Sequence, residues 1–360
     1  MLVFTADQLR GLAQGIFMKV GSSQKEARVV ADLLVKSNLA GHPSHGVIRI
    51  PWYIQAVKAG RAKPGVKTTI VKETPSTAII DGHWGWGQAV ATEAMELAIR
   101  KAKKSDVSAV GAINCWHVGR LADYSMMALK HDMIGITMVN SSPLVAPYGG
   151  SKRILSTNPM AFAIPAGKEK PFILDMATSV GAEGKIRVKL NRGEKVPDNW
   201  LLDKEGRPTN NPADLYAGGA LLPFGATVGY KGYGLCMLVD ILCGALTGAA
   251  CTSSREYLAR EFFGGNGTFV MAINIDSFTP INQFKARMDE LIRVIKESPV
   301  AEGFTEILVP GEPEFRSEAK MLREGISIEE KTWKEICETA KGLGLDAERI
   351  VSAVQARAKA

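Results

Sequence analysis

The sequence predicts an α/β fold whose α/β part lies between two helical stretches, one near each end of the chain. Apolar residues at helical spacing dominate the first sixty and the last eighty residues, whereas short apolar segments typical of strands fill the middle. Hydrophobic residues make up 46% and charged residues 22% of the 360 residues, an ordinary globular composition. This length predicts two or three domains, each with its own core.

Two N-terminal helices are predicted by their start signals. Thr5 is followed by Gln8 and Ser23 by Glu26, so each pair has the spacing of a capping box. Gly41 ends the second helix, and residues 47–60 have the pattern of a third. A proline-containing connector at residues 62–75 closes this part, which we take as residues 1–75.

The spacing of apolar residues changes at Thr77, and from there it is typical of strands separated by helices. The predicted strands are 77–81, 107–114, 134–140, 160–165, 172–176 and 268–275, and the predicted helices are 88–103, 120–130 and 230–247. Residues 191–214 are polar and turn-rich, which indicates an excursion from the sheet. Residues 76–279 are therefore predicted to form an α/β domain.

The chain becomes helical again after Pro280. Residues 305–309 interrupt this pattern, and residues 327–360 carry two amphipathic helices. Residues 280–360 are therefore taken as a C-terminal part that packs with the N-terminal part.

The charge distribution argues against nucleic-acid binding. There are 44 basic and 37 acidic residues, a net charge of +7, but the positive charge is dispersed. The densest basic run, residues 101–104, ends a predicted helix, where cations complement the helix dipole.

Cysteine usage and the apolar segments predict a cytoplasmic protein without a membrane span. The five cysteines have no CxxC spacing, so neither a disulfide framework nor a zinc knuckle is indicated. The N-terminus lacks the pattern of a signal peptide, and the longest apolar stretch, residues 235–250, contains Asp240 and is too short to span a bilayer.

The usual nucleotide-binding and hydrolase motifs are missing. No GxGxxG lies between a first strand and helix, since residues 342–347 follow a helix and residues 232–234 start one. P-loop, HExxH and GxSxG motifs do not occur either. The sequence therefore does not predict a Rossmann nucleotide site.

A polar stripe in residues 41–53 predicts a site for an oxo acid. If the third helix begins near Val47, then His45, Arg49 and Tyr53 share one face, with Ser44 just before it. A guanidinium can hold a carboxylate, and an imidazole can exchange a proton with the adjacent oxygen. Alternatively, Arg49 is a solvated surface residue and His45 a simple cap.

Further polar segments lie at the ends of the predicted strands, where α/β proteins collect ligands. They are residues 114–120, which contain His117, residues 140–143, 157–159 and 174–179, and the glycine-rich residues 229–234, where Lys231 can meet a phosphate. An alternative is a metal site of His42 and His45 with His83 or His117, although these motifs contain no acidic residue.

Taken together, these segments resemble the type 2 malate/L-lactate dehydrogenase family. The resemblance rests on residues 41–53, His117-Val-Gly119, Thr157-Asn-Pro159, Asp175–Ser179 and Gly229–Gly234, and it runs in consistent order from about residue 5 to residue 316. It implies a non-Rossmann NAD(P)-binding fold with a largely antiparallel mixed sheet. It also implies a helical domain formed by both chain ends, and a homodimer.

The resemblance also implies roles for particular residues. His45 or His117 is the acid/base, Ser44 is the partner of His45, and Arg49 and Tyr53 contact a small 2-oxo or 2-hydroxy acid. Cofactor contacts, to NAD or NADP, fall on Ser141, Asp175, Met176, Ala177, Lys231, Pro310, Gly311 and Glu312. No metal is expected.

One departure bears on the choice of substrate. Imino acid reductases of this family place an aspartate in a Ser-His-Asp relay, where this chain reads Ala182-Glu-Gly-Lys185. The sequence therefore favours hydroxy acid chemistry. A cyclic imino acid or diketogulonate reductase, and a non-catalytic nucleotide-binding protein, are the alternatives.

Overall fold

The central sheet is built from the apolar segments in the middle of the chain. The computed structural model describes residues 1–259 and 265–359. The sheet has the order β2-β3-β4-β11-β5-β6-β7, in which only β3 and β4 are parallel neighbours. Its strands are β2 (Thr69–Glu73), β3 (Thr77–Asp81), β4 (Val107–Cys115), β5 (Met133–Val139), β6 (Met160–Ile164), β7 (Phe172–Met176) and β11 (Asn266–Asn274). The prediction of a mixed, mostly antiparallel sheet is confirmed, although the strand β2 was taken for part of a connector.

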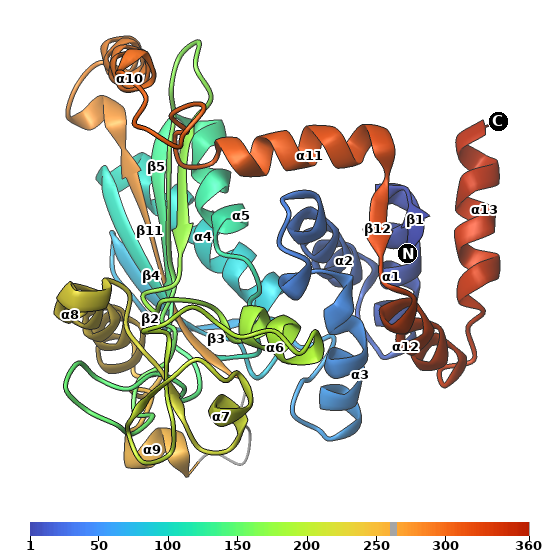
Figure 1. Ribbon diagram of the computed structural model, residues 1–360. Coiled ribbons are helices and arrows are strands. Elements are labelled where there is room, and N and C mark those ends of the chain that lie inside the picture. The colour runs from blue at the N-terminus through green and yellow to red at the C-terminus, as the bar shows by residue number, and fades with distance from the viewer. Residues whose placement is uncertain (260–264, 360) are drawn as a thin grey trace.

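Helices cover both faces of this sheet, as Figure 1 shows. On the face toward the helical part lie α4 (Gly87–Ser105), α5 (Ala122–Ser125) and the 3₁₀ helix η3 (Met126–His131). On the other face, α8 (Tyr230–Asp240) continues into a π-helix, η5 (Ile241–Leu246), where a single helix was predicted. Alternation along the strands explains the two layers, because Val110 and Ala112 pack against α4 while Gly111 leaves room for Thr247.

The helical part joins the two ends of the chain. It contains α1 (Ala6–Lys19), α2 (Gln24–Leu39), α3 (Ile50–Lys58), α12 (Glu330–Lys341) and α13 (Ala347–Lys359). The helices α1 and α13 are in contact, and β1 (Leu2–Phe4) pairs antiparallel with β12 (Ile326–Ile328). A helical part formed by both chain ends, as the family resemblance implies, is therefore confirmed.

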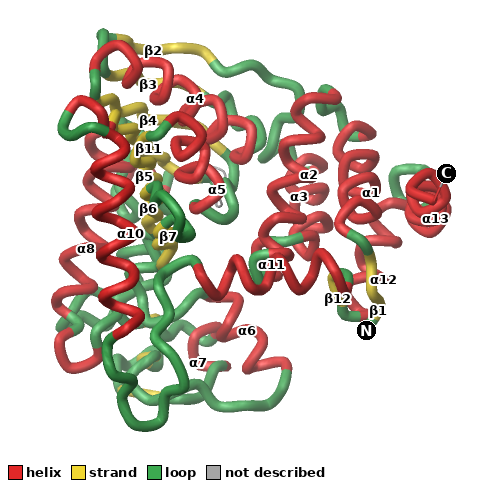
Figure 2. The backbone as a smooth tube through the Cα atoms, turned by 90° about the horizontal axis from the view of Figure 1, so that it is seen from above, coloured by secondary structure: helices red, strands yellow, loops and turns green. Residues whose placement is uncertain are grey.

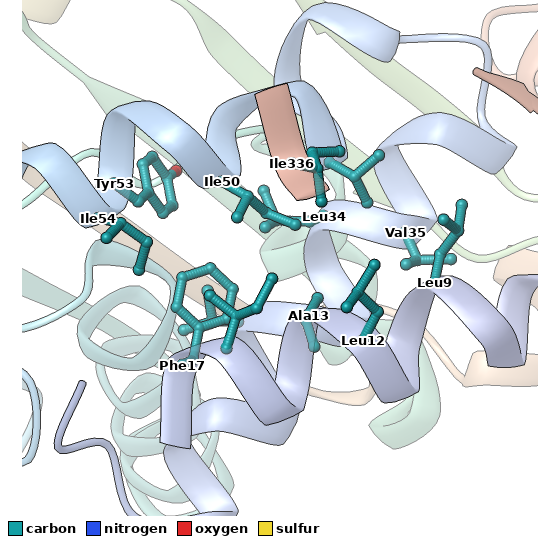
Figure 3. Close-up of a cluster of buried hydrophobic side chains, with 14 of the residues drawn as sticks. Leu9, Leu12, Ala13, Phe17, Leu34, Val35, Ile50, Tyr53, Ile54 and Ile336 are labelled. Atoms are coloured by element: carbon teal, nitrogen blue, oxygen red, sulfur yellow. The ribbon is translucent and has the colours of Figure 1, made fainter. Parts of the chain in front are cut away.

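The predicted helix starts show which local signals were correct. Thr5 and Gln8 form the complete capping box. Ser23 caps the backbone N–H of Glu26, and the carboxylate of Glu26 accepts from the backbone N–H of Gly65 at 2.9 Å. Apolar side chains between these helices form the core in Figure 3, where Ile336 of α12 lies among residues of α1, α2 and α3.

The remaining elements lie around the sheet and the helical part. They are α6 (Glu183–Asn191), α7 (Ala213–Tyr216), α9 (Arg255–Leu258), α10 (Ile281–Glu297), α11 (Glu312–Glu324), the small sheet of β8 (Leu201–Leu202), β9 (Pro208–Thr209) and β10 (Ala220–Leu221), and the 3₁₀ helices η1 (Pro43–His45), η2 (Val47–Arg49), η4 (Ala226–Val228) and η6 (Ile275–Ser277). Seen from above in Figure 2, α11 runs between the sheet and the helical part. No helix in residues 1–259 and 265–359 is long and apolar enough to cross a membrane.

The boundary between the two parts is apolar and continuous. Trp86 and Trp116 come from the α/β part, yet both are fully buried in the core of the helical part. Trp116 directly precedes His117 and shares this core with Ile50 and Tyr53, so the fold brings residues 41–53 against residues 114–120.

Candidate active site

The loop that carries His45 is held by α2. Gly41 adopts a φ of +80°, which ends α2, and the loop then forms two short 3₁₀ turns. Asn38 accepts from the backbone N–H of Val47 at 2.9 Å. The helix α3 begins at Ile50, three residues later than predicted, with Pro51 in its first turn. His45 and Arg49 therefore precede the helix, and the 3₁₀ turns rather than a helical face bring them toward Tyr53.

The two predicted histidines lie face to face. The rings of His45 and His117 are nearly parallel, at an interplanar angle of 9°, with centroids 5.9 Å apart. Ser44 Oγ lies 3.3 Å from His45 Nδ1, and Tyr53 Oη lies 2.8 Å from His117 Nδ1. The structure thus brings together residues that are more than sixty positions apart in the sequence.

Arg49 is oriented by its neighbours and forms no ion pair with a described residue. Its Nε donates to the backbone oxygen of Ser44 at 2.6 Å, and its guanidinium carbon lies 5.2 Å from the centre of the Trp52 ring. Among the described residues, no carboxylate lies within ion-pair distance of Arg49. Burial lowers the pKa of this guanidinium. An anionic ligand would supply the missing negative charge.

Both histidines are held neutral by their surroundings. Burial is the largest cause, followed by the positive charge of Arg49, and together they lower the pKa of His45 to about 3. The same two causes, with His45 as a third, lower the pKa of His117 well below its ordinary value. In the absence of a bound anion, neither imidazole is protonated to the imidazolium at neutral pH.

A second polar cluster lies at the end of β7. Asp175 accepts from the backbone N–H of Ala122 at 2.8 Å and lies 3.9 Å from Arg120 Nε, while Arg120 also contacts Asp123 at 3.4 Å. Burial raises the pKa of Asp123 to about 6 and also raises that of Asp175, with Arg120 opposing both shifts. Asp175, a predicted cofactor contact, therefore also fixes the start of α5.

The other predicted cofactor contacts on the α/β part lie at strand ends and at the start of α8. Ser141 follows β5, Met176 ends β7, and Ala177 comes next. The backbone oxygen of the residue after Ala177 accepts a hydrogen bond from the backbone N–H of Phe224. Phe224 in turn packs against the first turn of α8. In that turn Lys231 is exposed and has no ion pair with any described residue. This leaves a cation available to a phosphate.

Residues 310–312 lie beside β7, the strand at one edge of the sheet. The oxygen of Pro310 accepts from the backbone N–H of Ile173, and Gly311 adopts a φ of +100° against the Ile173 side chain. Glu312 accepts from the backbone N–H of Val309 and pairs with Lys296, so its carboxylate is already engaged. Gly311 also borders a cavity of about 360 Å³, lined by Lys36, Arg120, Asp123, Ile173, Glu314 and Phe315 among others.

The segment that departs from the imino acid reductases lies beside Ser44. The helix α6 begins there, and a Cβ on Gly184 would lie 3.0 Å from Ser44 Cβ. Glu183 accepts from Arg187 and from the hydroxyl of Tyr216 at 2.8 Å. Within the described residues, no hydrogen bond joins Glu183 to Ser44 or His45. The chain therefore supplies no carboxylate to a serine–histidine relay here.

Sequence reasoning missed two residues that contact the predicted site. Gln88 Nε2 donates to Tyr53 Oη at 2.6 Å, and the Trp52 ring lies 5.2 Å from the His117 ring. Trp52 could have been found, since it neighbours Tyr53 in a segment already chosen. No sequence signal marked Gln88, because its partner lies 35 residues away and belongs to another part of the fold.

The described part of the structure does not support the alternative of a metal site. His42 pairs with Glu314 at 3.2 Å, and His83 contacts Thr69 and Asp81. In residues 1–259 and 265–359, no group of three or more His, Cys, Asp or Glu side chains is placed to hold a metal ion.

Known proteins resemble this chain over nearly its whole length. A family model described as malate/L-lactate dehydrogenase matches residues 4–337. The malate dehydrogenase of Pyrococcus abyssi is 41% identical over 343 residues, covering 94% of each chain. The structure of sulfolactate dehydrogenase from Methanocaldococcus jannaschii matches with a TM-score of 0.87 at 39% identity, covering 97% of this chain and 99% of that one. Ureidoglycolate dehydrogenase (NAD(+)) of Escherichia coli O157:H7 is 31% identical, covering 89% of this chain and 91% of its own.

Proposed function

Because the chain belongs to the malate/L-lactate dehydrogenase family, we propose that it transfers a hydride between NAD(P) and a small 2-hydroxy acid/2-oxo acid pair of the malate/oxaloacetate or lactate/pyruvate type. It is an oxidoreductase of the malate/sulfolactate dehydrogenase type, and its family uses a nicotinamide cofactor. The observation that carries the proposal is the unpaired, oriented guanidinium of Arg49 beside two neutral histidines.

Arg49 is proposed to hold the substrate carboxylate. Its Nε is taken by Ser44, so its terminal nitrogens are left for the fork that binds a carboxylate. A 2-oxo acid carries its carbonyl on the next carbon, so a carboxylate on Arg49 directs that oxygen toward the facing imidazoles of His45 and His117. Tyr53 is fully buried with its hydroxyl on His117, so its proposed contact with the substrate would lie beside that histidine.

A neutral imidazole suits the oxidative direction. His45 or His117 would take the hydroxyl proton as the C2–H bond breaks, and Ser44 would orient the His45 ring. When bound, a nicotinamide supplies the hydride acceptor for oxidation and the hydride donor for reduction. In reduction, the same imidazole would return the proton to the oxygen. The substrate carboxylate would favour the charged imidazolium by offsetting Arg49.

The proposed cofactor contacts fit a group that carries phosphates and a carboxamide. Lys231 is an exposed cation without an ion pair in the described residues. Asn158, which is bound to α8 through the Cys236 backbone, has a buried side-chain oxygen without a hydrogen-bond partner. We propose Ser141, Asp175, Met176, Ala177, Lys231 and residues 310–312 as the cofactor contacts, with residues 310–312 acting through backbone atoms because Glu312 is engaged.

We also propose a homodimer. The outer sides of α8, η5 and α10 face away from the sheet on the same side of the molecule (Figures 1 and 2). They expose Met237, Leu238, Ile241, Leu246, Leu291 and Val294, each at least 40% accessible. Such apolar surfaces mark association sites. Light scattering after size exclusion would test this, and a monomer at micromolar concentration would contradict it.

The function is tested by following NADH and NADPH oxidation with oxaloacetate, pyruvate, sulfopyruvate, 2,3-diketogulonate and a cyclic imine in parallel. We expect turnover of at least one 2-oxo acid, and a fall in kcat of about 10²–10⁴-fold in His45→Ala or His117→Ala with the fold intact. Turnover of the imine or the diketogulonate alone would support the alternative reductases. Near wild-type turnover in both variants would contradict the site.

A further inference from the structure

A buried chain of hydrogen bonds leads from α4 to the site. Gln88, in the first turn of α4, is 1% exposed, and its Nε2 donates to Tyr53 Oη at 2.6 Å. Tyr53 is fully buried, and its Oη lies 2.8 Å from His117 Nδ1. Among the described residues, Gln88 and His117 are the two hydrogen-bond partners of this hydroxyl.

The number of available hydrogens determines the direction of each hydrogen bond in this series. The Tyr53 hydroxyl has one hydrogen, and its oxygen already accepts from the Gln88 amide. The hydroxyl hydrogen is therefore left for His117 Nδ1, which can accept it only without a hydrogen of its own. A neutral imidazole whose Nδ1 is bare carries its hydrogen on Nε2.

We propose that Gln88 is a positioning residue that, through Tyr53, holds His117 in the neutral tautomer with hydrogen on Nε2. His117 then offers a hydrogen-bond donor to the substrate oxygen, and His45 exchanges the proton. The roles at the substrate rest on the proposed function, whereas the tautomer is a property of the protein alone.

The surroundings of Tyr53 and His117 oppose other protonation states of these two side chains. A proton on His117 Nδ1 would point at the Tyr53 oxygen, so the Tyr53 hydrogen would need a new acceptor. Tyr53 cannot easily release it, because burial raises the pKa of this hydroxyl well above its ordinary range. A second positive charge beside Arg49 is also unfavourable.

The backbone fixes Gln88 in place. A Cβ on the preceding residue, Gly87, would lie 2.1 Å from the backbone oxygen of Trp116 and 2.4 Å from that of His117. Only glycine allows the first turn of α4 to approach this closely. The same contact therefore sets both ends of the hydrogen-bond chain.

The Gln88 amide has two orientations with opposite consequences. In the structure Nε2 faces Tyr53, and the buried Oε1 has no hydrogen-bond partner. With the amide turned over, Oε1 would accept the Tyr53 hydrogen, and Tyr53 would accept from His117 Nδ1. The position of the hydrogen on His117 thus reports which orientation is present.

The test is long-range ¹H–¹⁵N NMR of the ligand-free protein labelled with ¹⁵N in its five histidines, with His117→Ala used for assignment. We expect His117 in the Nε2–H form near pH 7.5. The Nδ1–H form would overturn the proposal. Because no substrate is present, an Nε2–H signal in a protein that turns over no oxo acid would reject the proposed function and leave the tautomer assignment standing.

Gln88→Met tests the positioning role, because methionine has similar length but cannot donate. We expect a mixture of His117 tautomers, a fall in kcat on the order of tenfold, and a smaller change in the KM of the oxo acid. Gln55→Met, at an exposed position of α3, is the matched control and should keep the wild-type spectrum and kcat. An unchanged tautomer and kcat in folded Gln88→Met would overturn the role.

Discussion

The guanidinium of Arg49 is fixed by the protein before any substrate binds. The Ser44 backbone oxygen holds Nε at 2.6 Å, and the Trp52 ring lies beside the guanidinium plane. For the carboxylate binding proposed above, these contacts would reduce the side-chain entropy that is lost. A lysine could supply the charge but neither the fork nor the Nε contact.

Arg49→Lys should therefore weaken substrate binding more than it slows the chemistry. Loss of a charge-assisted pair of hydrogen bonds corresponds to a rise of about 10- to 100-fold in the KM of the oxo acid. Steady-state kinetics at saturating cofactor would measure it. Arg28→Lys, at an exposed position of α2, should change nothing. An unchanged KM in Arg49→Lys would contradict the assignment.

The neutral histidines make the protein sensitive to acid. The pKa of His45 is about 3 in the folded state against an ordinary value of 6.5, so between these values the unfolded chain binds the extra proton. The free energy of unfolding should fall as pH drops from 6.5 toward 3. Between pH 7.5 and pH 5, we expect the Tm of His45→Ala to fall less than the Tm of the wild type. His131→Ala, at an exposed site, should lose as much as the wild type.

At the scale of elements, two helical glycines have opposite roles. Gly87 begins α4 against the backbone of residues 116 and 117, whereas a Cβ on Gly234 of α8 would meet nothing within 4 Å. Gly87→Ala should lower the free energy of unfolding by about 1–3 kcal/mol through overpacking. Gly234→Ala should raise it by about 0.5–1 kcal/mol because alanine loses less entropy in a helix.

Thermal unfolding followed by circular dichroism would compare these two variants. Gly87→Ala should also lose activity, since the backbone of His117 must move, while Gly234→Ala should keep it. Equal changes in Tm for both substitutions would show that the close approach of α4 to residues 116–117 does not constrain the fold.

Elements with local signals were predictable, and elements that depend on distant partners were not. The capping box at Thr5 placed the start of α1 correctly, and the regular apolar spacing indicated a helix after it. In contrast, β1 and β12 are three residues each and form only because the chain ends meet. The exposed strand β2 has no apolar face, so its pairing with β3 could not be read from periodicity.

The candidate site divides in the same way. His45, Arg49 and Tyr53 lie in one short segment, so the sequence could group them, and the family resemblance added His117. The link from Tyr53 to Gln88 depends on the packing of α3 against α4, which no spacing encodes. The predicted start of α3 lies three residues early, although Pro51 falls in the first turn only of a helix that begins near Ile50.

At the scale of the whole molecule, the C-terminal helix α12 packs against α3, which directly follows the segment that contains His45 and Arg49. Ile336 of α12 is fully buried in the core that also contains Ile50 and Tyr53 (Figure 3). Ile336→Ala should cost about 2–5 kcal/mol of stability. Leu322→Ala, at a residue 59% exposed, should cost little.

Hydrogen exchange would locate the effect of Ile336→Ala. We expect protection to fall in α1, α2 and α3, while the central sheet keeps its protection, and activity to be lost at a lower temperature. Uniform loss across the sheet would mean that the two parts unfold as one cooperative unit.

The pairing of the chain ends also sets an order of events during synthesis. The N-terminal amino group lies 3.1 Å from Glu330, 329 positions away, and β1 pairs with β12 beside it. Closing a loop of this length costs on the order of 5 kcal/mol in chain entropy. The sheet can assemble while the ribosome is still translating, but the helical part beside His45 and Arg49 must wait for α12. A nascent chain would therefore hold an assembled sheet before the segment that contains these two residues has its full support.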